Sequence, residues 1–181
     1  MTEELEVLAA VTRRLDEAGI PYMLTGSMAL SFYAVPRMAR DIDLVVELSP
    51  SDASRLCDLL EGDFYVDRAR VREAVEHQGA FSVIHLPLVV KVDLMVRKDT
   101  DYRRVEFARR RRLTLEGHPL SIVAPEDLVI SELDSARVSR SEAQLDDARN
   151  VLGAEPHLDR PYLERWIAAL GLEAAYREVA Q

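Results

Sequence analysis

The 181-residue sequence predicts a protein of the α/β (α+β) class, in which helices flank a mixed sheet. Two observations support this class. Short apolar runs alternate with helical patterns over residues 1–123, and helical periodicity continues without strand signals over residues 124–181. We therefore expect a core of residues 1–123 that carries the chemistry, with a C-terminal helical subdomain of residues 124–181 packed on it.

The changes of apolar period along the chain place the individual elements. Apolar residues at helical spacing predict a first helix over 3–18, which ends at Gly19, and Pro87 splits two strand-like runs into a hairpin. The expected strands are 22–25, 44–48, 81–86 and 88–96, with two short strands in 112–123 that turn at Glu116-Gly117. The other expected helices are 27–34, 51–61, 68–76, 101–111, 125–137, 141–152, 159–169 and 171–180.

The composition limits the classes of function. A net charge of −9 argues against a broad basic surface for nucleic acid. Residues 97–112 are the exception: eight basic against three acidic residues give +5, which leaves −14 for the remainder. This segment is either a solvated arginine-rich helix face or a positive rim for phosphates. No apolar run approaches the roughly 20 residues that span a bilayer, and the N-terminus lacks a signal-peptide pattern, so we expect a cytoplasmic protein without a membrane partner.

Three aspartates and a Gly-Ser turn form the most informative pattern. Asp41 and Asp43 are two residues apart at the start of an apolar run, so in a strand they share one face, and Asp93 lies inside another apolar run. Adjacent carboxylates repel unless a cation lies between them, and magnesium favours carboxylates together with substrate phosphates. Gly26 suits a tight turn, and Ser27 offers its hydroxyl and amide to a phosphate. The pattern indicates phosphoryl or nucleotidyl transfer.

Together these motifs resemble the polymerase-beta nucleotidyltransferase superfamily. The similarity rests on Gly-Ser, a spacer of thirteen residues, Asp-X-Asp and a later aspartate between hydrophobic residues. Within the superfamily, the small bacterial nucleotidyltransferases of the AbiEii-toxin type are the more similar ones. They share an arginine before Asp-X-Asp, here Arg37, and a Pro-Glu-Asp-Leu helix start, here residues 125–128. The resemblance covers roughly residues 20–150 and implies a nucleotidyltransferase fold.

The resemblance also implies an activity and a site. A nucleoside monophosphate would move from a nucleoside triphosphate to an acceptor hydroxyl, which could belong to RNA (a tRNA end), a protein or an aminoglycoside-type small molecule. An antitoxin is an implied partner if the chain is the toxin of a toxin–antitoxin pair. Two magnesium ions would bind the three aspartates, and the triphosphate would bind to further residues. The implied catalytic and metal-binding residues are Asp41, Asp43 and Asp93, and the implied nucleotide-binding residues are Gly26, Ser27, Arg37 and Arg40.

Two departures from the family pattern leave an alternative open. Ala39 replaces a frequent threonine before Asp-X-Asp, and Glu132 stands where a lysine is frequent in the helix after Glu-Asp-Leu. A charge reversal beside the nucleotide would weaken triphosphate binding. The alternative is a catalytically weak or inactive nucleotidyltransferase-like protein that binds a partner or regulates it.

Overall fold

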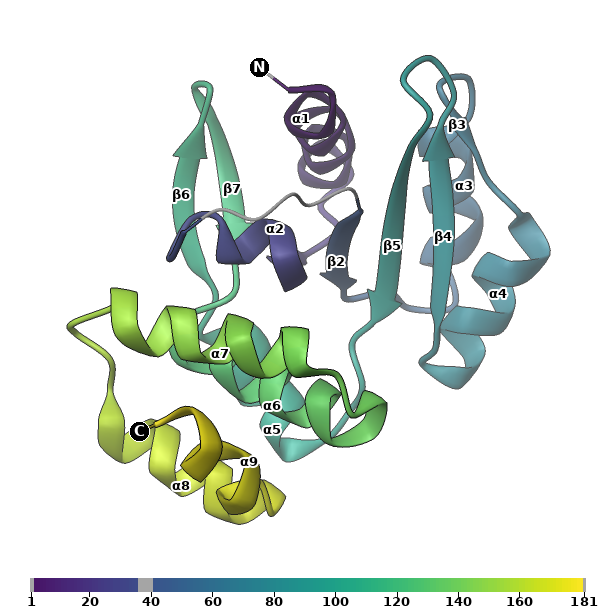
Figure 1. Ribbon diagram of the computed structural model, residues 1–181. Helices are drawn as coiled ribbons and strands as arrows, with labels where there is room; N and C mark the ends of the chain where they lie inside the picture. The colour runs from purple at the N-terminus through teal and green to yellow at the C-terminus, as the bar shows by residue number, and fades with distance from the viewer. Residues whose placement is uncertain (1, 36–40, 181) are drawn as a thin grey trace.

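The computed structural model describes residues 2–35 and 41–180, and their seven strands form one mixed sheet (Figure 1). The strand order is β3-β4-β5-β2-β1-β7-β6. β2 runs parallel to β5 and β1 to β7, and the other neighbouring pairs are antiparallel. This architecture confirms the predicted fold class. The strands are β1 (Tyr22–Thr25), β2 (Ile42–Val46), β3 (Phe64–Tyr65), β4 (Ala80–His85), β5 (Val90–Val96), β6 (Arg111–Leu115) and β7 (His118–Ile122).

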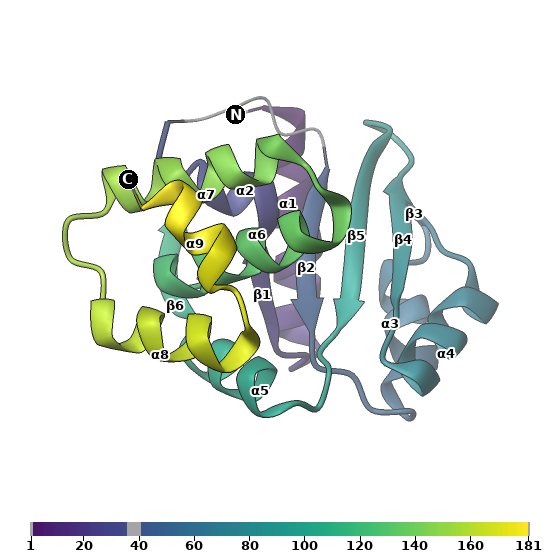
Figure 2. The same cartoon turned by 60° about the horizontal axis from the view of Figure 1, so that its bottom comes forward.

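The helices lie on both sides of this sheet. Helices α1, α3 and α4 pack on one face, α2 crosses the other, and α6 to α9 form a layer over α2 and the lower part of the sheet (Figure 2). The helices are α1 (Glu3–Glu17), α2 (Gly26–Leu30), α3 (Asp52–Leu60), α4 (Arg68–His77), α5 (Asp101–Ala108), α6 (Pro125–Ser139), α7 (Glu142–Ala154), α8 (Arg160–Leu170) and α9 (Glu173–Val179).

The central strands bury one face more deeply than the other. In β2, the residues Ile42, Leu44 and Val46 are fully buried, whereas Asp43 and Val45 between them are only partly buried. Strands β4 and β5 alternate in the same way. Because successive side chains of a strand point to opposite faces, the apolar set lies under α1, α3 and α4 and the polar set lies on the opposite face. That opposite face carries all three aspartates of the sequence motif.

Several predicted boundaries are wrong. The strand after the aspartate pair is Ile42–Val46 rather than 44–48, so Asp43 is inside the strand. The predicted helix 27–34 ends at Leu30 and continues as turns, and the helix expected over 101–111 ends at Ala108, because β7 pairs with the chain from Arg111 onward. The strand β3 was not predicted, since two residues are too few to show a period. The hairpin around Pro87 is confirmed.

The boundary between a core and a C-terminal helical subdomain, which we placed between residues 123 and 124, stays a prediction. Contacts between α2 and both α6 and α7 join the two parts of the chain. Tyr33 also donates a hydrogen bond of 2.7 Å to the carbonyl oxygen of Val123, at the predicted boundary itself. Within residues 2–35 and 41–180, no helix is long and apolar enough to cross a membrane.

Candidate active site

The polar face of the sheet carries a row of side chains that crosses four adjacent strands. Asp43 of β2 lies beside Asp93 of β5 in the parallel register. On the outer sides, Asp43 is paired with Thr25 of β1 and Asp93 with Ser82 of β4. Two aspartates of the sequence motif are therefore brought together: fifty residues apart in the chain, Asp43 and Asp93 occupy neighbouring positions on one face.

Gly26 begins α2 directly after Thr25, and Asp43 explains why this residue is a glycine. The φ angle of Gly26 is +66°, in the left-handed region that glycine adopts without steric cost. A Cβ atom added there would lie 2.4 Å from Oδ2 of Asp43 and 3.0 Å from its Cγ. The backbone of the Gly-Ser turn thus approaches the aspartate too closely for a side chain, and the turn and the carboxylate form one structural unit.

Lys91 joins two of the three carboxylates. Its Nζ lies 3.4 Å from Oδ2 of Asp41 and 2.8 Å from Oδ2 of Asp93. The hydroxyl of Ser82 donates a 2.5 Å hydrogen bond to the other oxygen of Asp93. We expected Asp93 to be a charge within a buried strand, but its side chain is 26 % exposed because the strand buries only its other face.

The electrostatics of the cluster centre on Asp43. Burial, and then the negative charges of Asp93 and Asp41, raise the pKa of Asp43 to about 6, against the opposing effect of the Lys91 ammonium. Hydrogen bonding to Asp93 is the main reason why the pKa of Lys91 is raised. One ammonium group is thus not enough to offset the repulsion that Asp43 experiences, so the cluster favours an additional positive charge.

A divalent metal is the natural candidate for that charge, and the donor set fits it. Carboxylate oxygens are the ligands that magnesium prefers, and the Lys91 ammonium occupies a cation position between Asp41 and Asp93. Within the part of the chain that the structure describes, no group of three or more His, Cys, Asp or Glu side chains is already arranged around a metal position.

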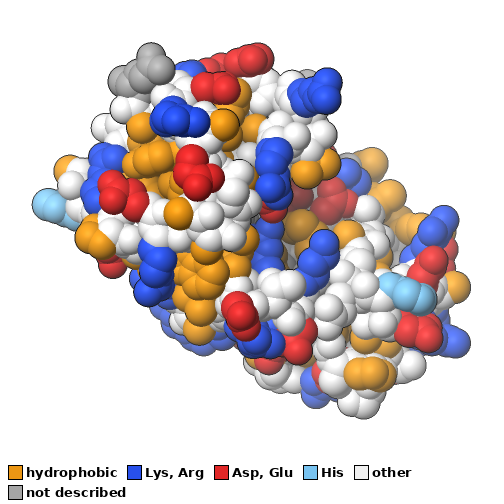
Figure 3. Space-filling view, turned by 90° about the horizontal axis from the view of Figure 1, so that it is seen from below, with side chains coloured by type: hydrophobic (Ala, Val, Ile, Leu, Met, Phe, Trp, Pro, Cys, Tyr) orange, Lys and Arg blue, Asp and Glu red, His pale blue; other side chains and the backbone are white. Residues whose placement is uncertain are grey.

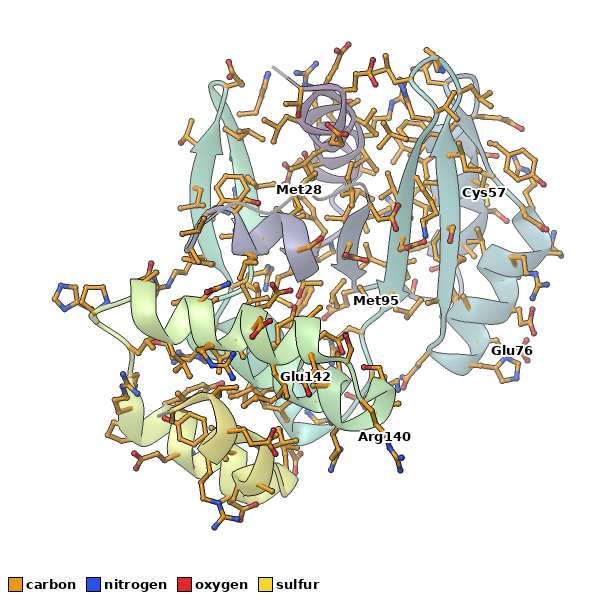
Figure 4. All side chains as sticks on the ribbon, viewed as in Figure 1. Met28, Cys57, Glu76, Met95, Arg140 and Glu142 are labelled. Carbon is orange, nitrogen blue, oxygen red and sulfur yellow. The ribbon has the colours of Figure 1, made fainter. Side chains whose placement is uncertain are left out.

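A cavity of about 560 Å³ opens beside Asp43, between the sheet and helices α5, α6 and α7. Gly26, Ser27 and Asp43 line one end of it, and Val45 and Met95 give it an apolar floor. Met95 lies on the side of the sheet that faces α7 (Figure 4). The volume is within the range of small-molecule sites, which are roughly 300–1,000 Å³. The predicted nucleotide-binding residues Gly26 and Ser27 therefore face a space of suitable size.

The far wall of the cavity contains both signs of charge. Arg103 donates 2.9 Å hydrogen bonds to both carboxylate oxygens of Glu106, which is 2 % exposed, and Ser131 donates to the same carboxylate at 2.8 Å. Glu132, at the position where we expected a lysine in related proteins, is 8 % exposed and also lines the cavity. From below, the space-filling view shows a hollow bordered by basic and acidic side chains (Figure 3).

The arginine-rich segment 97–112 is not a free positive rim. Its arginines are largely engaged with acids: Arg97 with Glu47, Arg104 with Asp99 and Asp101, and Arg109 with Glu126 and Asp127. Arg97, Lys98 and Arg103 line the cavity. Each of the two interpretations of this segment therefore applies to part of it. Three of its cations line the cavity, and most of its arginines form ion pairs with acids.

The Pro-Glu-Asp-Leu sequence at the start of α6 forms a second acidic cluster, which is buried. Asp127 is fully buried and accepts hydrogen bonds from Tyr162 at 2.5 Å, Tyr102 at 3.2 Å and Arg109 at 3.0 Å. Glu126 accepts from Arg109 at 3.0 Å and from the backbone amide of Asp159 at 2.9 Å. These bonds tie α5, α6 and α8 together, so this motif holds the C-terminal helices in place.

The structure brings together Asp41, Asp43, Asp93, Gly26 and Ser27. Arg37, Arg40 and Ala39 lie outside the described residues. Sequence reasoning missed Lys91 and Ser82. The spacing Lys91-Val92-Asp93 holds the signal for the first, because residues two apart in a strand share a face. No comparable signal exists for Ser82, whose position depends on the pairing of β4 with β5.

Comparisons with known proteins relate this geometry to a class of fold. No protein-family model and no curated protein matches the chain. Among solved structures, it is similar to ANT(2")-Ia in complex with adenylyl-2"-tobramycin, at 16 % identity over 97 % of this chain and 99 % of that one, with a TM-score of 0.55. The lincomycin-bound lincosamide antibiotic adenylyltransferase LnuA has 12 % identity over 86 % and 99 %, with a TM-score of 0.55.

A nucleotidyltransferase-like protein from Paracoccidioides brasiliensis is similar as well, at 19 % identity over 97 % of this chain and 93 % of that one, with a TM-score of 0.58. The protein therefore has the nucleotidyltransferase fold. At these identities the likeness establishes the fold alone, and the function has to be argued from the residues of the site.

Proposed function

We propose that this protein is a metal-dependent nucleotidyltransferase that moves a nucleoside monophosphate from a nucleoside triphosphate to an acceptor hydroxyl and releases pyrophosphate. One observation carries the proposal. Asp43 and Asp93 are register partners on the polar face of the sheet, and the Gly26-Ser27 turn closes directly over Asp43 at the mouth of a cavity of about 560 Å³. If Asp43 only supported the Gly26-Ser27 turn, an uncharged side chain would serve equally well at this position.

The roles of the residues follow from their positions. Asp41, Asp43 and Asp93 would hold two magnesium ions, which supply charge neutralisation at the attacking and leaving oxygens. Gly26 and Ser27 would bind the triphosphate through backbone amides and the serine hydroxyl. Asp93 would accept the proton of the acceptor hydroxyl, because Ser82 already orients its carboxylate. Arg37 and Arg40 would be further phosphate partners.

For the acceptor, the charges favour a cationic small molecule over RNA. The net charge of the chain is −9, and most arginines of segment 97–112 are held in ion pairs with acids. An RNA acceptor would need a basic surface beyond the site. Two structures with the same fold contain antibiotic-derived molecules, adenylyl-2"-tobramycin and lincomycin. An aminoglycoside-type acceptor is therefore the class to test first.

The second candidate is a nucleotidyltransferase-like protein that binds or regulates a partner without catalysis. Glu132 favours it, because a carboxylate on the cavity wall would repel a triphosphate. The raised pKa of Asp43 favours the enzyme, because a binding module has no need to maintain carboxylates that repel one another. The AbiEii-type relationship, the antitoxin partner and the cytoplasmic location stay predictions.

The experiment that tests the function measures label transfer. The purified protein is incubated with magnesium and each α-³²P-labelled nucleoside triphosphate, together with aminoglycosides, total RNA or lysate protein. Asp43→Asn should reduce transfer by at least about a thousandfold. Asp146→Asn is the matched control, because Asp146 is 63 % exposed and lies on α7, where it pairs with Arg149. If no acceptor is labelled and no nucleotide binds in the presence of magnesium, the non-catalytic candidate replaces the enzyme.

A further inference from the structure

Lys91 is the residue of the candidate site that the proposed function leaves unexplained. It lies two residues before Asp93 on β5 and on the same face of the sheet. Its ammonium contacts Asp41 and Asp93 together, at 3.4 and 2.8 Å. It also lowers the pKa of Asp43, although burial and the other two carboxylates outweigh it. A single cation of the protein thus acts on all three carboxylates that would hold the metal.

The choice of lysine at this position is informative. The chain contains 23 basic residues, of which only Lys91 and Lys98 are lysines. The other ion pairs between described residues use arginine, as in the contacts of Arg109 with Glu126 and Asp127. Arginine forms rigid, forked contacts with carboxylates, whereas lysine is a single point charge on a flexible stem. The Lys91 side chain is 42 % exposed, so it has space to turn toward solvent.

We propose that Lys91 is a displaceable counter-cation of the carboxylate cluster: it bridges Asp41 and Asp93 while the metal is absent, moves out when a divalent metal enters, and thereby sets the metal affinity of the site. This inference rests on the proposed metal-dependent function. The ammonium and a divalent ion cannot share the oxygens of Asp41 and Asp93 without strong repulsion, so each lowers the occupancy of the other. Competition of this kind makes metal binding weaker alone than with a nucleoside triphosphate, whose phosphates supply further ligands.

An ordinary surface ion pair predicts something different. Exposed pairs contribute about 0–1 kcal/mol to stability and have no systematic effect on a bound ligand. Lys91 as a positioning residue for the carboxylates would be a third case, in which its loss disorders the cluster and weakens metal binding. The direction of the change in metal affinity on removing the charge therefore separates the three roles.

The test is a titration of the full-length protein with MnCl₂, in which free Mn²⁺ is measured by electron paramagnetic resonance with and without a non-hydrolysable ATP analogue. Lys91→Met should bind Mn²⁺ about tenfold more tightly than the wild type, because the ammonium that competes for the carboxylates has been removed. In the presence of a chelator, its melting temperature should fall, because the carboxylates lose their counter-charge. Lys91→Arg should retain the wild-type affinity or bind more weakly, because the charge remains.

Lys98→Met, compared in the absence of the ATP analogue, is the matched control, since it makes the same change of side chain at the other lysine of the chain. The ion pairs of Asp41 and Asp93 with described residues are those with Lys91, so Lys98→Met should stay within about twofold of the wild type. Equal or weaker Mn²⁺ binding by Lys91→Met would overturn the inference and leave the metal-dependent function intact. Absence of Mn²⁺ binding by the wild type, with and without the analogue, would overturn both.

Discussion

The molecule contains two acidic clusters, which differ in the burial of their carboxylates and in the groups that neutralise them. At the start of α6, Asp127 is fully buried, and three side chains from α5, α8 and the chain after α5 donate hydrogen bonds to it. On the polar face of the sheet, Asp43 and Asp93 are only partly buried, and the cation that the described residues place beside them is Lys91. The protein neutralises the first cluster with several donors, whereas among the described residues only Lys91 forms an ion pair with the second.

The difference shows how to separate structural from functional acids. A buried carboxylate costs free energy unless the protein neutralises it, and the bonds to Asp127 serve this purpose. Burial nevertheless raises the pKa of Asp127, against the effect of its hydrogen-bond donors. For Asp43, burial and two neighbouring carboxylates all raise the pKa, and among the described residues Lys91 opposes them. Carboxylates that repel one another beside a cavity indicate a binding site for a cationic ligand. A buried carboxylate with several hydrogen-bond donors indicates a structural role, here the attachment of neighbouring helices.

The largest expected effect contrasts the two clusters directly. Asp127→Ala should lower the free energy of unfolding by about 4 kcal/mol, because it leaves Arg109, Tyr102 and Tyr162 without their shared acceptor. Asp93→Ala should cost less than about 1 kcal/mol, because it relieves repulsion with Asp43 and removes only half-exposed contacts. Urea unfolding followed by circular dichroism measures both. Equal losses for the two variants would show that both clusters are structural.

The next effect concerns the close contact between the Gly-Ser turn and Asp43. Gly26→Ala should destabilise the protein by about 2–3 kcal/mol, from a strained left-handed residue and a clash with the carboxylate. Gly171→Ala is the matched control, because Gly171 has a φ of +67° and a Cβ there would meet nothing within 4 Å. The control should cost only about 1 kcal/mol. If the two variants lose the same stability in thermal or urea unfolding, the contact with Asp43 has no energetic weight.

Much of this contrast could be predicted from the sequence, because its physical basis is local. The i, i+2 spacing of Asp41 and Asp43 places both on one face of a strand, and the apolar residues around them place that strand in the sheet. The need for glycine at position 26 was also expected, although the sequence did not say that the group approached by the backbone is Asp43. Those inferences depend only on neighbouring residues and on the geometry of a strand.

The rest depends on long-range pairing, which a single sequence does not encode in a readable pattern. Asp127 is satisfied by Arg109 and Tyr162, eighteen residues before it and 35 residues after it. The helix expected to reach residue 111 ends at Ala108 because Arg111 pairs with Ile122 of β7. The cavity, too, exists only once three helices have been placed against the sheet. These features follow from tertiary contacts that override local preference.

A smaller effect is the pH dependence of the metal-free protein. The pKa of Asp43 is about 6 in the folded state, above the ordinary 3.8, so the folded state holds this proton more strongly than the unfolded chain. Because Asp43 ionises in the unfolded chain first, the free energy of unfolding falls as the pH rises from about 4 toward 6. It stays lower above pH 6. Between pH 4 and pH 7, the free energy of unfolding of the wild type should fall by about 2 kcal/mol relative to that of Asp43→Asn.

Urea unfolding of both proteins in the presence of a chelator measures this difference, and subtracting the variant removes the titration of all other groups. Magnesium should abolish the difference if the metal binds the ionised carboxylate. A wild type that gains stability relative to Asp43→Asn over the same pH range would show that Asp43 is neutralised by the protein, like Asp127, and would remove the contrast between the clusters.

The smallest expected effect comes from removing one of the hydrogen bonds to Asp127 and leaving the others. Tyr162→Phe removes the 2.5 Å hydrogen bond to Asp127 and leaves those from Tyr102 and Arg109. The guanidinium of Arg109 lies 3.6 Å from the centre of the Tyr162 ring, and phenylalanine keeps that contact. The variant should therefore lose only about 1.5 kcal/mol, the contribution of one hydrogen bond to a charged acceptor.

Tyr65→Phe, at a side chain that is 57 % exposed, should change the free energy of unfolding by less than about 0.5 kcal/mol in the same urea titration. A loss for Tyr162→Phe as large as that for Asp127→Ala would mean that the tyrosine hydroxyl, rather than the ion pair with Arg109, neutralises Asp127. The cluster would then depend on a single hydrogen bond for its stability. A loss near 1.5 kcal/mol would instead show that several donors share the carboxylate of Asp127, whereas on the sheet Lys91 alone of the described cations contacts both Asp41 and Asp93.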